Sequence, residues 1–252
     1  MPKHIVTTIK KIQYTQSTRE ISDESAPEFK IISQLIHPGE TVIDIGANLG
    51  MYTKYLSDIV SSTGTVVSIE PIKETFEILQ HIVRSLKMNN VLLYNNAVSD
   101  SQDTLLMEIP LYENGEENFY EAQVVKQKSN SAYRTVLVNA LSLDLMCSSL
   151  NKISFIKCDV EGHEYECLQG ASSILNRWKP SIYIEIQGNI EDVASRGYKT
   201  VRFLQNLSYD IYMFRGTTLW KRQPGEFNTN YFFLTPDHIH NLKAQQTIAL
   251  HV

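Results

Sequence analysis

Residues 42–50, which read Val-Ile-Asp-Ile-Gly-Ala-Asn-Leu-Gly, decide the fold of this chain. Their apolar half has the composition of a buried strand, and their glycine-rich half is typical of a turn that opens a helix. Residues 66–71, Val-Val-Ser-Ile-Glu-Pro, then predict a second strand that ends on the carboxylate of Glu70. This order predicts a site for an adenosine-containing cofactor, because glycines admit a ligand close to the backbone and a carboxylate accepts hydrogen bonds from ribose hydroxyls.

The spacing of the glycines indicates which cofactor is bound. Dinucleotide sites use G-x-G-x-x-G, whereas this turn has Gly46 and Gly50 with Asn48 between them. Asp44 precedes the turn, and its negative charge would oppose a pyrophosphate but favour an ammonium or a sulfonium. S-adenosylmethionine carries both cations, so we predict it as the cofactor. The simpler alternative is a tight turn without a ligand, with Glu70 as an ordinary solvated carboxylate.

Composition limits the class of protein. The chain has 252 residues, of which 42% are hydrophobic and 20% charged, with a net charge of -5, so one domain with an ample core is expected. The acidic balance disfavours nucleic acid as a partner. Cys147, Cys158 and Cys167 lack metal or disulfide spacing, which favours reduced thiols and a cytoplasmic location. The sequence has no apolar run of membrane-spanning length and no signal-peptide core.

Apolar runs and amphipathic segments alternate along the chain, which predicts an α/β fold with a Rossmann-like, mostly parallel sheet. The predicted parallel strands are residues 41–46, 65–70, 91–96, 153–159 and 181–186. The expected helices include one from Pro71 to about Leu86 and one over residues 164–178 that Pro180 ends. Residues 209–214 and 231–234 predict an antiparallel strand pair that closes the sheet.

Two regions fall outside this alternation, although both belong to the single predicted domain of residues 1–252. Residues 1–40, with a short apolar helix at Phe29 to Ile36, are expected to cover the first strand. Residues 101–138 predict a tyrosine-rich β-hairpin insertion that turns at residues 113–116, either as a substrate surface or as a solvated hairpin. Residues 41–100 would form the cofactor-binding half and residues 139–252 the catalytic and C-terminal half.

Polar side chains occur where the predicted parallel strands end. Ligands of open α/β sheets bind beyond the carboxyl ends of the strands, so these side chains should gather at one edge of the sheet. Any one of them taken alone would be better explained as a strand end or a helix cap. The set comprises Asp44, Glu70, Asn96, Asp159 and Glu185.

Together, several ordered motifs resemble those of the FkbM-family methyltransferases over roughly residues 40–235. The resemblance implies a class I S-adenosylmethionine-dependent methyltransferase fold and O-methylation of a hydroxyl on a glycan, a polyketide or another small metabolite. The first forty residues show no family pattern. The motifs are residues 44–53 (Asp-Ile-Gly-Ala-Asn-Leu-Gly-Met-Tyr-Thr), Glu70-Pro71, residues 97–100 (Ala-Val-Ser-Asp), Leu143-Asp144, residues 157–164 (Lys-Cys-Asp-Val-Glu-Gly-His-Glu) and Ile184-Glu185-Ile186.

The resemblance also implies roles for cofactor-binding residues. The turn of Gly46, Asn48 and Gly50 would surround the methionine part of the cofactor, with Asp44 near its cation and Glu70 on the ribose. The adenine edge would meet Asn96 and Ala97, where a side-chain carbonyl and a backbone N–H supply the complementary groups. Tyr52 and Thr53 would touch the carboxylate end, and Asp159 would close the site opposite Gly46.

Methyl transfer to an alcohol requires loss of a proton, and His163 is the expected base because its ordinary pKa lies near neutrality. The alternative is that His163 only caps or orients the following helix. Lys157 lies in a strand that should be buried, so it must pair with Glu185 or Glu161 or assist the acceptor. These four residues form the predicted catalytic set.

A divalent ion on Asp159, Glu161, His163 and Glu185 is a weighed alternative, because oxygen ligands at strand ends suit magnesium. No ligand spacing is diagnostic, so we predict no metal. Two other functions stay open on the residues alone: a nicotinamide- or flavin-dependent oxidoreductase on a similar sheet, and a cofactor-binding module without catalysis. The sequence specifies neither the acceptor nor the oligomeric state.

Overall fold

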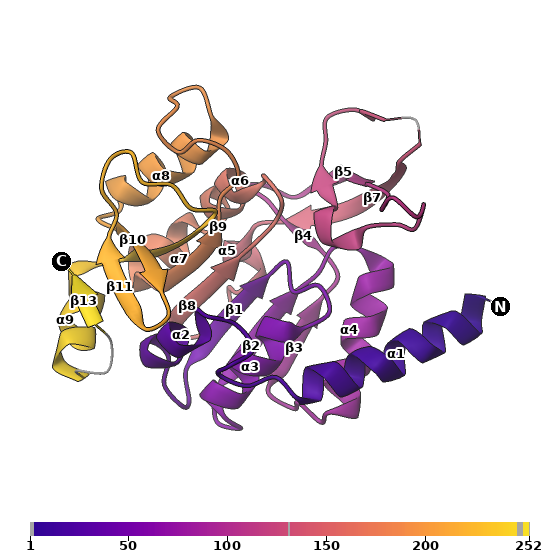
Figure 1. Ribbon diagram of the computed structural model, residues 1–252, viewed down its shortest axis with the longest axis horizontal. Coiled ribbons are helices and arrows are strands. Elements are labelled where there is room, and N and C mark those ends of the chain that lie inside the picture. Colours follow the sequence, from indigo (N-terminus) through magenta and orange to yellow (C-terminus); the bar gives the residue numbers. More distant parts are fainter. Residues whose placement is uncertain (1–2, 131, 246–248, 252) are drawn as a thin grey trace.

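The structure is a computed structural model that describes residues 3–130, 132–245 and 249–251. A nine-stranded sheet runs through it in the order β13-β11-β10-β12-β9-β8-β1-β2-β3 (Figure 1). Its strands are β1 (Thr41–Ile45), β2 (Thr65–Ile69), β3 (Val91–Tyr94), β8 (Ile153–Cys158), β9 (Ser181–Glu185), β10 (Asp210–Arg215), β11 (Thr218–Lys221), β12 (Asn230–Leu234) and β13 (Ala249–His251).

Five adjacent strands, from β3 through β2, β1 and β8 to β9, are parallel. This confirms the predicted parallel strands, although each of them ends one or two residues before its predicted end, β3 at Tyr94 by the larger margin. The predicted antiparallel pair also forms, because β12 pairs antiparallel with both β10 and β9. Two strands at one end of the sheet, β11 and the edge strand β13, were not predicted. The fold class is therefore the expected mixed α/β sheet.

Alternate strand residues supply two separate cores. On one face, Val42 of β1 packs in a cluster with Phe29, Leu56 and Leu242. On the other face, Ile43 of β1 packs in a cluster with Leu168, Leu175 and Leu204, which come from helices in the second half of the chain. The helices are α1 (Lys3–Arg19), α2 (Phe29–Leu35), α3 (Met51–Val60), α4 (Lys73–Ser85), α5 (Leu143–Met146), α6 (Glu164–Gln169), α7 (Ser172–Trp178), α8 (Arg196–Asn206) and α9 (Pro236–Gln245).

The N-terminal region contains more structure than the sequence indicated. The expected short helix is α2, and its Phe29 and Ile32 are fully buried in the cluster that also holds Val42 of β1. The preceding helix α1 was not predicted, since its outward residues include Ile9 and Ile12 and it shows no clear apolar face. It contacts α4 and runs along one side of the molecule (Figure 1). No helix within the described ranges is long and apolar enough to cross a membrane.

The insertion forms its own four-stranded sheet, in the order β4-β7-β5-β6. Its long strands pair antiparallel from Asp103↔Ala140 to Ile109↔Arg134, so the predicted hairpin exists but extends past residue 138. The turn at residues 113–116 forms too, as the tip of a small loop closed by a Leu111↔Glu117 bridge, and does not join the long strands. The elements are β4 (Ala97–Val98), β5 (Asp103–Ile109), the 3-10 helix η1 (Phe119–Glu121), β6 (Gln123–Val124) and β7 (Arg134–Leu141).

The single helix predicted over residues 164–178 is wrong, because the chain breaks it into α6 and α7 at Gly170. The reason lies in tertiary packing: a Cβ atom on Gly170 would lie 1.9 Å from the carbonyl oxygen of Ser99. The Gly170 carbonyl also accepts a hydrogen bond of 2.9 Å from the Asp144 amide. The break thus joins the helices to the end of β4.

This contact predicts the effect of Gly170→Ala. The added methyl group meets backbone on an unyielding segment, so we expect the free energy of unfolding to fall by about 2 kcal/mol or more. Urea denaturation measures the change. Ser173→Ala, at an exposed position of α7, should stay within about 0.5 kcal/mol of the parent chain. Equal stability of the two variants would show that the Ser99 contact is not restrictive.

Candidate active site

The glycine turn between β1 and α3 is held in a conformation that side chains oppose. Gly46 and Gly50 have φ angles of 73° and 86°, and Asn48 has a φ of 48°. The amides of Gly46 and Ala47 both donate to the carbonyl of Ile69, each at 3.0 Å. A Cβ atom on Gly46 would lie 1.8 Å from the carbonyl oxygen of Asp159, so only glycine fits there.

Glu70 ties this turn to the end of β2. Its Oε2 atom accepts a hydrogen bond of 3.0 Å from the Asn48 amide, and Oε1 accepts one of 2.8 Å from the Ile72 amide. Burial raises the pKa of Glu70 to about 7, and the two amides offset part of that effect. The carboxylate therefore has a structural contact that the sequence did not indicate, while each oxygen retains a lone pair for a ligand.

An open cavity with an empty volume of about 590 Å³ lies beside the turn. It brings together six of the predicted cofactor residues and one predicted catalytic residue, Glu161. Its apolar wall comes partly from the insertion, whose aromatic residues the sequence analysis related to a substrate surface and not to this cavity. The predicted residues are Gly46, Asn48, Glu70, Asn96, Ala97 and Asp159; the insertion supplies Met107, Phe119, Tyr120, Ala122 and Val124.

Four other predicted cofactor residues do not line this cavity. Asp44 is fully buried beneath the turn, where Thr53 Oγ1 donates to its Oδ2 atom at 2.6 Å. Thr53 also lies 2.6 Å from the hydroxyl of Ser68, so it joins β1, β2 and α3. Gly50 serves as the N-terminal boundary of α3. The fourth, Tyr52, lies in a second cavity.

Lys157 has partners other than the predicted Glu185 and Glu161. Its Nζ atom lies 3.3 Å from Asp159 Oδ2 and 3.7 Å from Asp44 Oδ1, and it donates to the Gly46 carbonyl at 2.9 Å. Burial would lower the pKa of Lys157, but the two carboxylates outweigh it and hold the pKa above its ordinary value. Lys157 is thus a charged anchor between β1 and β8 and cannot act as a base at neutral pH.

The second cavity, with an empty volume of about 550 Å³, opens at the carboxyl ends of β8 and β9. Asp159 lines both cavities, so the two sites meet at this carboxylate. Lys157 and Glu185, two predicted catalytic residues, line the second cavity together with Tyr52. Of the side chains predicted to gather at the strand ends, Glu70 and Asn96 line the first cavity, Glu185 lines the second, Asp159 lines both, and the buried Asp44 lines neither.

Three carboxylates gather where the cavities meet. Asp159, Glu161 and Glu185 each have an oxygen within 4.8 Å of the others. Burial and the neighbouring carboxylates raise the pKa of Glu161 to about 7, and burial followed by Asp159 raises the pKa of Glu185. Such a cluster holds a proton near neutral pH. It contains three of the four weighed metal ligands, but His163 lies outside it.

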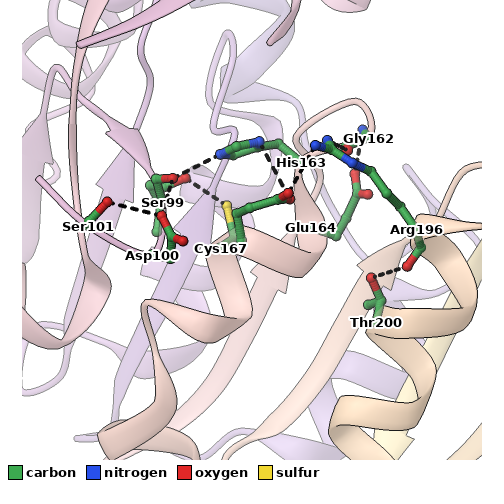
Figure 2. A network of polar contacts seen from close by, with 11 residues as sticks. Ser99, Asp100, Ser101, Gly162, His163, Glu164, Cys167, Arg196 and Thr200 are labelled. Carbon is green, nitrogen blue, oxygen red and sulfur yellow. Dashed lines mark hydrogen bonds and ion pairs between the residues drawn. The ribbon is translucent and has the colours of Figure 1, made fainter. Parts of the chain in front are cut away.

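His163 points away from both cavities, into a buried polar network (Figure 2). Its Nε2 atom lies 3.0 Å from the Ser99 hydroxyl, and Nδ1 lies 3.6 Å from Glu166 Oε2. Burial lowers its pKa. On the other side, Arg196 donates to the Gly162 carbonyl at 2.9 Å and pairs with Glu166 at 2.9 Å. The geometry favours the role of orienting the following helix, because the His163 ring lies between Glu166 of α6 and Ser99, and its side chain makes no cap hydrogen bond.

The Lys157 anchor predicts a stability effect. Lys157→Met leaves Asp44 buried without its cation, so we expect a loss of about 3–5 kcal/mol in the free energy of unfolding. Adding Asp44→Asn to Lys157→Met removes the unpaired buried carboxylate, so the double variant should recover at least part of this loss in stability. Denaturant unfolding at pH 7 measures both variants. A double variant no more stable than Lys157→Met alone would contradict the assigned pair.

A search among curated proteins finds no significant match to this chain. Among solved structures, the chain is similar to a Clostridium thermocellum protein assigned as an rRNA methylase, at 11% identity and a TM-score of 0.50, over 82% of this chain and 90% of that one. It also matches the FkbM methyltransferase of Methylobacillus flagellatus KT, at 15% identity and a TM-score of 0.49, over 89% of this chain. This chain covers 59% of that longer relative.

A third similar structure is Aeropyrum pernix fibrillarin with bound S-adenosyl-L-methionine, at 12% identity and a TM-score of 0.46, covering 81% of this chain and 71% of that one. At such identities, structural likeness reports on the fold. The family model for the methyltransferase FkbM domain matches residues 44–211, from Asp44 of the glycine turn to Ile211 of β10. The chain therefore belongs to the FkbM methyltransferase family and has the class I methyltransferase fold.

Proposed function

We propose that this protein is an S-adenosylmethionine-dependent O-methyltransferase. The observation that carries the proposal is the meeting of two cavities at Asp159, beside the carboxyl groups of Glu161 and Glu185, whose pKa values are raised. One cavity would hold the cofactor and the other the acceptor. In-line transfer needs the two reactants held close together and shielded from water, which adjoining cavities provide.

The cofactor cavity suits a cationic adenosine compound. Its lining has the carboxylates of Glu70, Asp159 and Glu161 and no lysine or arginine among the described residues, so a sulfonium would be favoured and a pyrophosphate opposed. Asn48 Oδ1 is buried there without a hydrogen-bond partner in the described part of the chain, and it can accept from a ligand. These features disfavour the nicotinamide and flavin alternatives.

Each part of the site has a role in the proposed reaction. Glu70 and the apolar wall of the insertion would bind the nucleoside, and the glycine turn would hold the methionine part. When bound, the cofactor supplies an electrophilic methyl group and becomes a thioether. The carboxylate cluster would take the proton of the acceptor hydroxyl, and its members Asp159 and Glu185 line the acceptor cavity. Lys157 fixes Asp159, and His163 orients helix α6.

The acidic charge of the protein indicates which kind of acceptor it would bind. A net charge of -5 and acidic cavities support a small hydroxylated acceptor and oppose nucleic acid, whose phosphates require a basic surface. The three cysteines are buried and free, which supports a reducing compartment such as the cytoplasm.

The cofactor assignment predicts binding of S-adenosylmethionine by the intact protein. Glu70→Ala removes the ribose partner and the tie to the turn, so we expect affinity to fall at least about tenfold, the equivalent of about 1.4 kcal/mol. Isothermal calorimetry measures this loss. Glu77→Ala, at an exposed position on α4, is the matched control and should bind normally. If the parent protein binds no S-adenosylmethionine, the proposed function is wrong.

The proton assignment predicts a pH profile. The base acts in its deprotonated form, and the cluster holds a proton up to a pKa of about 7 at Glu161. Activity, measured as kcat/KM, should therefore rise as pH increases through about 7 and then level off. Glu185→Gln should lower kcat/KM by about 10²–10⁴-fold with cofactor affinity retained. Normal activity of this variant, or a profile flat from pH 6 to 8, would exclude the cluster as the base.

A further inference from the structure

We propose that Glu28 is a positioning residue of the methyl-transfer site, which it serves by fixing the Tyr52 ring over the ammonium of Lys157. The inference rests on the proposed function, since it takes the glycine turn and Asp159 as parts of that site. Glu28 precedes residues 44–211, the segment that the family model matches. The N-terminal region thus contributes to the cofactor site without touching the cofactor.

Glu28 is held at the start of α2. Its main-chain carbonyl accepts hydrogen bonds of 2.9 Å from the amides of Ile31 and Ile32, and Ile32 is fully buried. Glu28 is itself buried, at 6% exposure, and lines the second cavity. Packing alone does not require a carboxylate there, because taking one out of water costs free energy unless hydrogen bonds replace its hydration. The role of Glu28 therefore follows from its hydrogen-bond partner.

That partner is Tyr52, whose ring is fixed by three contacts. Its hydroxyl donates a hydrogen bond to Glu28 Oε1, and its ring meets that of Phe29 in a T-shaped arrangement with centroids 5.2 Å apart. Over its face, Lys157 Nζ lies 5.0 Å from the ring centroid. Burial, followed by Tyr183 and Glu28, raises the pKa of Tyr52 far above its ordinary value. The phenol therefore stays protonated at neutral pH, so Tyr52 covers the ammonium and does not act as a base.

The ring covers a cation whose other contacts lie where the two cavities meet. The Lys157 ammonium has three donor hydrogens, and oxygen atoms of Gly46, Asp159 and Asp44 lie 2.9, 3.3 and 3.7 Å from its Nζ atom. An aromatic face attracts a desolvated ammonium and shields it from water. Without this cover, water would compete with Asp159 and the Gly46 carbonyl for the donor hydrogens. The orientation of Tyr52 therefore affects the glycine turn, where the methionine part of the cofactor would lie.

Tyr55, one turn further along α3, makes a comparable contact that does not reach the site. Its hydroxyl lies 2.6 Å from Asp23 Oδ1 and 2.7 Å from the Phe29 carbonyl, and its ring stacks on Phe29 with centroids 3.8 Å apart. Tyr55 lines neither of the two cavities. Loss of its hydroxyl weakens the attachment of the N-terminal region to α3 but leaves Lys157 covered, so Tyr55→Phe is the matched control.

The NMR signal of the Lys157 ammonium in the isotope-labelled intact protein reports on the cover directly. Protons over an aromatic face are shielded, and a buried ammonium exchanges slowly with water, so we expect a shielded, slowly exchanging signal. Glu28→Ala should move this signal toward those of exposed lysines, with exchange at least about tenfold faster. Glu28→Gln keeps an acceptor for the Tyr52 hydroxyl and should restore the parent signal, whereas Tyr55→Phe should leave it unchanged. An unshielded signal in the parent protein would overturn the inference.

Calorimetry with S-adenosylmethionine measures the consequence for the site. We expect Glu28→Ala to weaken cofactor binding about fivefold, the effect of one lost hydrogen bond that supports the site. Tyr52→Phe should lose a similar factor, and the double variant no more than either, because both changes break the same hydrogen bond. Glu28→Gln and Tyr55→Phe should bind as the parent protein does. A purely structural role would instead lower the free energy of unfolding in Glu28→Ala and Tyr55→Phe alike, with cofactor affinity unchanged in both.

The results separate this inference from the proposed function. If the parent protein binds no S-adenosylmethionine, the proposed function is wrong. If the parent protein binds it, while Glu28→Ala keeps both the parent affinity and the parent Lys157 signal, the positioning role alone is wrong. Additive losses of affinity in the double variant would also overturn that role, because Glu28 and Tyr52 would then act separately.

Discussion

The site depends on one buried ammonium. Lys157 extends from β8 under the glycine turn, where it meets the Gly46 carbonyl and lies between Asp44 and Asp159. A charged lysine in such a position is stable because the carboxylates offset its desolvation, and the fully buried Asp44 in turn needs the cation. The ion pair of Lys157 with Asp44 therefore joins the neighbouring strands β1 and β8 close to the ends where both cavities begin.

The sequence was informative where local pattern and tertiary structure agree. Buried strands of a parallel sheet are short apolar runs, so their positions and the edge at which they end could be predicted, together with the glycine turn and the acidic end of β2. Prediction from local pattern failed where a contact between residues distant in sequence determines the secondary structure. The helix break at Gly170 follows from the carbonyl of Ser99, and helix α1 is held by α4 without a strong apolar stripe of its own.

The same distinction applies to the site. Residue types at strand ends identified which side chains gather, but not how they divide between two cavities. His163 was a reasonable base on its ordinary pKa alone, yet its direction is set by the buried network with Ser99 and Glu166. Aromatic residues of the insertion suggested a substrate surface, whereas Phe119 and Tyr120 line the first cavity, beside the glycine turn. Direction and burial of a side chain are properties of the assembled fold.

The close approach of Gly46 to the carbonyl of Asp159 limits what the chain can carry at this turn. Backbone meets backbone there, with no room for even a methyl group on residue 46. The spacing between the turn that follows β1 and the end of β8 is therefore set by main-chain packing.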